Sequence, residues 1–218
     1  MRQQLIENLI SRIKKRLVTE RKTDKLSLQI SRLIIDKFKK KENFKIEGIY
    51  FERGEDYASF DLKCRFKINK KMDDPFSIDA EADMQEMEIE ITYNPDKFPE
   101  SMNDLVAEIK ETVEHELEHI EQQNFEDMET EDDEDIDKDD PDQNFKYLKS
   151  NVEIPAYVRG LIKRSKTKKT SLEDAMEEWF KENKKKFKNP KEEWPIIKDI
   201  WLNYANQARK EEKIKKFK

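Results

Sequence analysis

Only two histidines occur among the 218 residues of this chain, and both lie in the stretch VEHELEHIEQ, as His115 and His119. Glu116 directly follows the first of them. Residues four positions apart lie on one face of a helix, so the two imidazoles can reach a single metal ion. His-Glu-x-x-His is the pattern in which two histidines bind Zn²⁺ and the glutamate acts as a general base.

Glu116 has a different chemical role from the histidines in this pattern. It projects about 100° around the helix from His115, so it does not join the histidines at the metal. Zinc lowers the pKa of a coordinated water to about 7, and a nearby carboxylate can accept the proton as the oxygen attacks a carbonyl carbon. The spacing therefore predicts metal-assisted hydrolysis with Glu116 as the base.

The helix that carries the pair is expected over residues 99–123. On a helical wheel its apolar residues form one stripe about 80° wide, and the two histidines lie on roughly the opposite side. The alternative to a metal site is an ordinary solvated helix face, because Glu114, Glu118 and Glu121 surround the pair. The members of the apolar stripe are Val106, Ile109, Val113, Leu117 and Ile120.

A catalytic zinc ion takes three protein ligands, and the chain has no third histidine, so a carboxylate must serve. With its motif, the sequence resembles the gluzincins, the zincin metallopeptidases that include thermolysin, in which a glutamate on the next helix completes the site. The matching pattern here is EIPA, beginning at Glu153. HELEH followed by E-x-P-A-Y is also similar to phage-encoded peptidases. The resemblance covers about residues 76–165 and implies Zn²⁺ bound by His115, His119 and Glu153.

Other assignments for the third ligand stay open. Pro155 is tolerated only near the start of a helix, so the helix must begin near Asn151, or contain a kink, for Glu153 to point inward. Glu153 can instead be an ordinary first-turn glutamate that the helix dipole stabilises. Carboxylates of the acidic tract at 126–142 are rival ligands.

The resemblance also implies roles for residues around the metal. The phenol of Tyr157 or Tyr147, or the guanidinium of Arg159, can stabilise the oxyanion of a tetrahedral intermediate, and we select Tyr157 as the catalytic candidate. Packing at a helix interface is the alternative for each of them. The strand-like run at 86–93 is expected to pair with an extended peptide substrate.

Apolar periodicity predicts the elements that position these residues. Helices are expected at 3–18, 25–40, 99–123, 144–166, 171–186 and 193–210, and strands at 44–52, 57–68 and 76–93, the last being one strand or two. This order indicates an α+β fold with a small antiparallel or mixed sheet packed on the motif helix, as in zincins. We expect an N-terminal helical segment at 1–42, a zincin-like catalytic domain at 43–166 and a C-terminal helical segment at 167–218.

Composition restricts the setting in which the chain works. Charged residues make up 43% of it, and the tract 126–142, which holds twelve acidic residues against Lys138, is expected to be a mobile loop. No run of 18 apolar residues and no signal-peptide pattern occurs, so we expect a cytoplasmic protein, in a host cell or a virion if it is viral. The lone Cys64 is expected to fill the core rather than to react.

These features predict an intracellular zinc metallopeptidase with a protein or peptide substrate and no membrane partner. The alternatives are a non-catalytic zincin-fold interaction or virion-associated structural protein, and a nucleic-acid-associated factor that uses basic segments such as IKRSKTKK. Nucleic acid is the less favoured partner, because this segment has no interleaved aromatics and glutamates dilute the basic C-terminal tail. The oligomeric state is left open.

Overall fold

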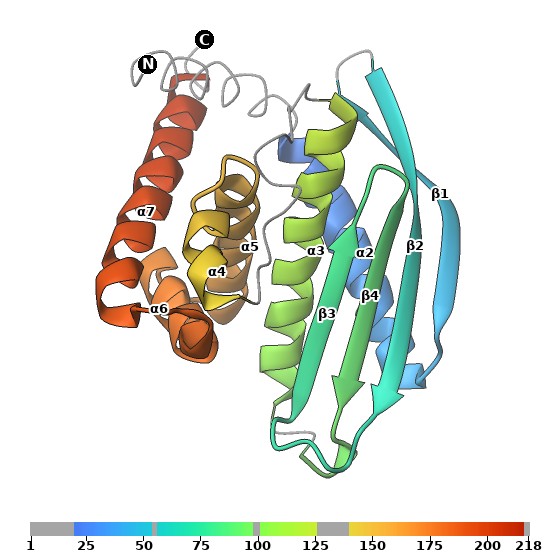
Figure 1. Ribbon diagram of the computed structural model, residues 1–218. Helices are drawn as coiled ribbons and strands as arrows, with labels where there is room; N and C mark the ends of the chain where they lie inside the picture. Colours follow the sequence, from blue (N-terminus) through green and yellow to red (C-terminus); the bar gives the residue numbers. More distant parts are fainter. Residues whose placement is uncertain (1–19, 54–55, 98–100, 126–139, 216–218) are drawn as a thin grey trace.

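A computed structural model describes residues 20–53, 56–97, 101–125 and 140–215 (Figure 1). The chain has an α+β fold with a small mixed sheet followed by a group of helices. The strands are β1 Phe44–Arg53, β2 Asp56–Ile68, β3 Phe76–Ala82 and β4 Glu86–Tyr93. The helices are α2 Glu20–Lys40, α3 Met102–Phe125, α4 Pro141–Tyr147, α5 Glu153–Lys168, α6 Leu172–Asn183 and α7 Pro190–Lys215, with short 3₁₀ turns at Pro95–Lys97 and Lys184–Lys186.

The four strands are ordered β1-β2-β4-β3 in the sheet. The pairs β1–β2 and β3–β4 are antiparallel, whereas β2 and β4 run parallel, with Cys64 opposite Ile89. β4 therefore has a strand on both sides, and β3 lies at an edge of the described sheet.

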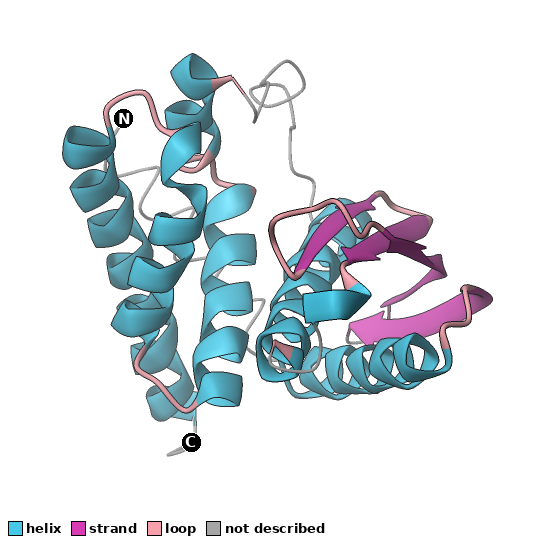
Figure 2. Ribbon diagram, turned by 90° about the horizontal axis from the view of Figure 1, so that it is seen from below, coloured by secondary structure: helices cyan, strands magenta, loops and turns pink. Residues whose placement is uncertain are grey.

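Helices α2 and α3 cover one face of the sheet (Figures 1 and 2). Alternate residues of β2 and β4 are buried beneath them, as the alternation in the sequence predicts. Cys64 is among these residues, and burial raises the pKa of its thiol to about 12, so its predicted place in the core is confirmed. The opposite face is charged and carries cross-strand ion pairs such as Lys67 Nζ to Glu90 Oε2, at 2.7 Å.

A second hydrophobic core joins α4, α5, α6 and α7 on the other side of α3 (Figure 1). Trp201 is fully buried in it, and its Nε1–H donates to the carbonyl oxygen of Leu148 at 3.1 Å. The capping box predicted at Ser171 and Asp174 begins α6. Since α3 and α5 lie side by side, the two cores meet along these two helices.

Several element boundaries differ from the sequence-based expectation. The run 76–93 forms the two strands β3 and β4, which was one of the two alternatives. The single helix expected at 144–166 is wrong: α4 ends at Tyr147 and α5 begins at Glu153. Pro155 favours the interruption, because it has no N–H to donate to the carbonyl of Asn151 and its ring would clash with that carbonyl inside a helix. The helix expected at 3–18, and residues 126–139 of the acidic tract, lie outside the described residues.

The domain boundaries placed at 42 and 166 stay a prediction. Buried apolar residues group α2 with the sheet and α3, and they group α4 and α5 with α6 and α7. Among the described helices, none is long and apolar enough to cross a membrane.

Candidate metal centre

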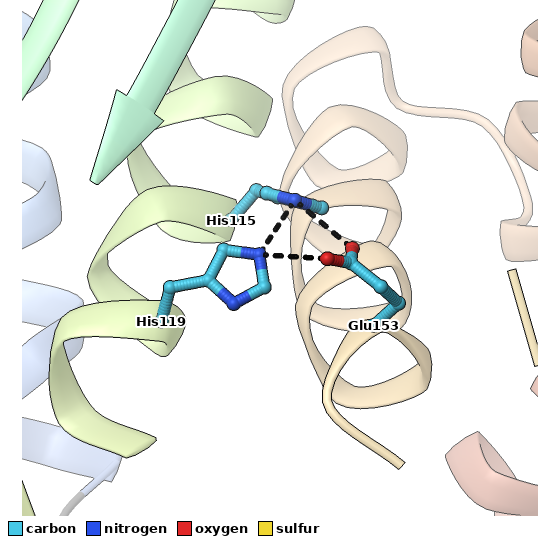
Figure 3. A group of neighbouring side chains, drawn as sticks. All are labelled: His115, His119 and Glu153. Atoms are coloured by element: carbon cyan, nitrogen blue, oxygen red, sulfur yellow. Dashed lines mark hydrogen bonds and ion pairs between the residues drawn. The ribbon is translucent and has the colours of Figure 1, made fainter. Parts of the chain in front are cut away.

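His115 and His119 on α3 and Glu153 on α5 lie together where the two helices meet (Figure 3). The Nε2 atoms of the two imidazoles are 3.0 Å apart. Oε2 of Glu153 is 3.5 Å from Nε2 of His115, and Oε1 is 3.4 Å from Nε2 of His119. The three side chains are 15%, 12% and 8% exposed, respectively. The described residues thus bring together the three side chains that the sequence analysis grouped.

The separations between these ligand atoms suit a zinc ion. Zinc–ligand bonds of about 2.0–2.1 Å at tetrahedral angles place neighbouring ligand atoms roughly 3.3 Å apart. The two imidazole nitrogens are 3.0 Å apart here, and each lies 3.4 or 3.5 Å from a different oxygen of the Glu153 carboxylate. In addition, Oε2 of Glu153 is buried and accepts no hydrogen bond from the described residues. Two imidazoles and one carboxylate form a ligand set that catalytic zinc uses.

α3 is buried on two faces, which explains the position of its histidines. Four residues of the predicted stripe, Ile109, Val113, Leu117 and Ile120, are buried against the sheet and α2, and Val106 is partly buried. The opposite face packs on α5, so Glu114, Glu118 and Glu121 are only 7%, 0% and 1% exposed. The alternative of a solvated helix face around the histidines is therefore wrong.

Basic residues of α5 pair with this buried acidic face of α3. Nη1 of Arg159 lies 3.1 Å from Oε2 of Glu121 and also pairs with Glu118. Nζ of Lys163 lies 3.2 Å from Oε2 of Glu114. Arg159 is therefore held in the helix interface, and it is not among the residues that line the cavity of the histidines. Of the two roles considered for Arg159, this position agrees with packing at a helix interface.

Gly160 allows α5 to approach α3 closely. A Cβ atom at this position would lie 3.1 Å from the carbonyl oxygen of Glu111, closer than ordinary van der Waals contact. The close approach keeps the Glu153 end of α5 within reach of the histidine side chains.

Glu153 reaches the histidines from the first turn of α5 (Figure 3). Pro155 is the third residue of the helix, a position at which no intrahelical N–H bond is made. The main-chain N–H of Glu153 donates instead to Oγ of Ser150, at 3.2 Å. The requirement that the helix begin close to Asn151 is met, so Pro155 is compatible with a ligand at Glu153.

The pKa values of His119 and Glu153 show how strongly the two groups interact. Burial opposes a charge on His119, but the hydrogen bond and charge of Glu153, with the charge of Glu116, raise its pKa to about 9. Burial likewise opposes the ionised form of Glu153, yet the hydrogen bond from His119 and the charges of both imidazoles hold its pKa below the usual value. The pocket therefore stabilises a carboxylate next to positive charge.

Two tyrosines support the ligands from α4 and α5. The phenol of Tyr147 hydrogen-bonds the carboxylate of Glu153. The ring of Tyr157 contacts the ring of His115 edge-on, with centroids 4.7 Å apart, and stacks on Trp201 at 5.0 Å. Burial and the charge of Glu153 raise the pKa of both phenols far above 10, so both keep their protons at neutral pH.

The ligands open into a cavity of about 500 Å³ that Glu116 and Tyr157 also line. Residues 78–82 of the edge strand β3 form one of its walls. Glu116 is 6% exposed, and its carboxylate lies close enough to His119 to raise the pKa of that imidazole. The predicted base thus shares one cavity with the predicted ligands.

The far end of the cavity carries further carboxylates. Glu108, Glu111 and Glu182 line it together with Arg164. Nη1 of Arg164 lies 3.0 Å from Oε2 of Glu111, and Nη2 lies 2.6 Å from Oε1 of Glu182. Burial, followed by the charges of Glu111 and Glu182, raises the pKa of Glu108 to about 8.

Two residues of this region, Gln122 and Glu108, were not predicted from the sequence. The helical spacing of each places it on the face of α3 that carries the histidines, which marks its position but not its role. Gln122 comes three residues after His119, and Oε1 of Gln122 lies 3.2 Å from Nδ1 of that imidazole. Glu108 comes seven residues before His115. Seven residues are close to two full turns, so Glu108 and His115 lie on the same side of α3 and both line the cavity.

Models of known protein families, curated proteins and solved structures yield no match to this chain. The functional interpretation therefore rests on the residues of the site and their geometry.

Proposed function

We propose that this protein is a zinc-dependent hydrolase of peptide bonds. The observation that carries the proposal is the convergence of two imidazole nitrogens, 3.0 Å apart, on the carboxylate of Glu153, whose oxygens Oε1 and Oε2 lie 3.4 Å from His119 and 3.5 Å from His115, in a cavity that Glu116 also lines. A helix face that served only for packing would not need two imidazoles and a carboxylate to meet in this way.

Each residue of the centre has a distinct part in the proposed reaction. His115, His119 and Glu153 would hold Zn²⁺, which supplies Lewis acidity by polarising a carbonyl group and lowering the pKa of a coordinated water to about 7. Glu116 accepts the proton of the attacking water and passes it to the leaving amine. The protonated phenol of Tyr157 donates a hydrogen bond to the oxyanion that develops on the carbonyl oxygen.

The edge strand β3 supports a peptide as the substrate. Its residues 78–82 line the cavity, and in the described sheet it has a strand partner only on the β4 side, so its free side can pair with an extended chain. The expectation that 86–93 binds the peptide is wrong, because β4 pairs with β2 and β3. A strand edge beside a motif helix and a third-ligand helix is the arrangement that the zincin resemblance implies.

The test is peptide hydrolysis measured together with zinc content in the full-length chain. We expect Glu116→Gln to keep its zinc and to lose hydrolysis by a factor of about 10²–10⁴, because the base is gone and the ligands remain. His115→Ala is expected to lose both zinc and activity. Asp104→Asn, an exposed carboxylate on the same helix, serves as the control and should change neither.

The outcomes also separate the rival function. A metal that serves only structure is the alternative, and it is supported by the position of the site between the two hydrophobic cores. Zinc binding with no hydrolysis of any peptide in a diverse library would favour that alternative. Full hydrolytic activity in Glu116→Gln would contradict the proposed mechanism.

A further inference from the structure

Gln122 lies almost one turn after His119 on α3 and is 1% exposed. Its side-chain amide contacts three groups. Nε2 donates to the carbonyl oxygen of Val152 at 2.9 Å and to Oε1 of Glu118 at 3.4 Å, and Oε1 lies 3.2 Å from Nδ1 of His119. Because Val152 directly precedes Glu153, the amide joins the helix that bears two ligands to the start of the helix that bears the third.

The chemistry of these partners fixes the direction of each hydrogen bond. A main-chain carbonyl and a carboxylate only accept, so the NH₂ group of Gln122 must face Val152 and Glu118. The amide oxygen then faces His119, and since this oxygen also only accepts, Nδ1 of the imidazole carries a proton. The remaining ring nitrogen, Nε2, is the one that faces His115 and Glu153 and can bind a metal.

We propose that Gln122 is a positioning residue of the metal centre. It selects the tautomer of His119 that offers Nε2 as a ligand, and its bond to Val152 holds Glu153 at the distance at which the carboxylate can join. A hydrogen bond to the outer nitrogen of a metal-binding histidine fixes the ring and typically contributes 10–100-fold to metal affinity. This inference rests on the proposed zinc site.

An amide that merely ties two elements together would have a different effect, and the same helix provides one for comparison. Nδ2 of Asn124 donates to the carbonyl oxygen of Met84 at 3.1 Å and to that of Ile120 at 2.9 Å. Asn124 therefore ties α3 to the turn between β3 and β4, and it is not among the residues that line the cavity of the histidines. Asn124→Leu is thus a matched control for Gln122→Leu.

The test is the affinity of each full-length variant for Zn²⁺, measured by competition with a chelator, with thermal unfolding of the metal-free proteins in parallel. Both Gln122→Leu and Asn124→Leu are expected to lower the unfolding temperature. Only Gln122→Leu is expected to weaken zinc binding, by about 10–100-fold. Gln122→Glu retains an acceptor for the Nδ1–H of His119 but has no donor for Val152 and Glu118, so its zinc affinity is expected to lie between those of the wild type and Gln122→Leu.

Equal zinc affinity in the wild type and Gln122→Leu would overturn the role of Gln122 and leave the proposed function intact. A wild-type chain that binds no zinc would instead overturn the proposed function.

A measurement on the wild type covers the case in which Gln122→Leu does not fold. The chain has only two histidines, so the ring nitrogens of ¹⁵N-histidine-labelled protein are readily assigned by NMR. In the zinc-loaded protein we expect Nδ1 of His119 to be protonated and Nε2 to be the metal-bound nitrogen. A metal-bound Nδ1 would overturn the proposal.

Discussion

At the scale of single residues, the candidate metal centre consists of two imidazoles one turn apart on α3 and a carboxylate that faces them from α5. The spacing of His115 and His119 was sufficient to predict that their imidazoles share one side of α3, because helix geometry alone places residues four apart on one face. Gln122 could not be assigned from the sequence in the same way. Its role depends on the carbonyl of Val152, a contact between residues 30 positions apart that no local pattern specifies.

Glu108 provides a test of the electrostatics at the far end of the cavity. Burial raises its pKa from 4.5 to about 8, so between these pH values the folded state binds more protons than the unfolded state. The contribution of Glu108 to the free energy of unfolding then falls as the pH rises from about 4.5 to 8. We expect Glu108→Gln to be more stable than the wild type by roughly 1 to 3 kcal/mol at pH 9 and nearly equal to it at pH 4.

Urea unfolding of both proteins at the two pH values measures this difference. An equal difference at pH 4 and pH 9 would show that the carboxyl of Glu108 titrates normally in the folded protein.

At the scale of elements, the sequence predicted which helices and strands form better than it predicted how they are arranged in space. The alternation of β2 and β4 and the stripe of α3 were correct, because each reports a periodic, half-buried surface. The parallel pairing of β2 with β4, which leaves β3 at the edge, was not predictable, since several strand orders bury the same faces. Pro155 signalled either a helix start near Asn151 or a kink, and the structure has the break, with α4 ending at Tyr147 and α5 beginning at Glu153.

The buried ion pairs between α3 and α5 give a prediction for this pair of helices. Arg159 neutralises Glu118 and Glu121, which are 0% and 1% exposed. Arg159→Met leaves both carboxylates without their partner on α5, so we expect a loss of about 3 to 5 kcal/mol in the free energy of unfolding. The triple variant Arg159→Met, Glu118→Gln, Glu121→Gln is expected to recover most of that loss, because no unpaired charge is left buried.

Chemical denaturation of the two variants and the wild type provides the measurement. A loss below about 1 kcal/mol for Arg159→Met would mean that the interface tolerates the unpaired carboxylates.

At the scale of the whole molecule, the candidate metal centre lies between two hydrophobic cores. One core joins α2, the sheet and α3, and the other joins α4 to α7. The ligands come from α3 and α5, the helices along which these cores meet, so a bound metal would link the two halves as well as supply chemistry. The sequence predicted the three side chains that meet here, whereas the packing of α4 and α5 on α7 depends on contacts between residues far apart in the chain.

Native mass spectrometry of the full-length chain determines whether His115, His119 and Glu153 bind one zinc ion. After incubation with Zn²⁺ and removal of the excess, the wild type is expected to carry one zinc per chain. His119→Ala is expected to carry none, because only one imidazole and one carboxylate remain, too few ligands to hold the ion. A wild-type chain without zinc, or a His119→Ala chain that retains as much zinc as the wild type, would contradict the account.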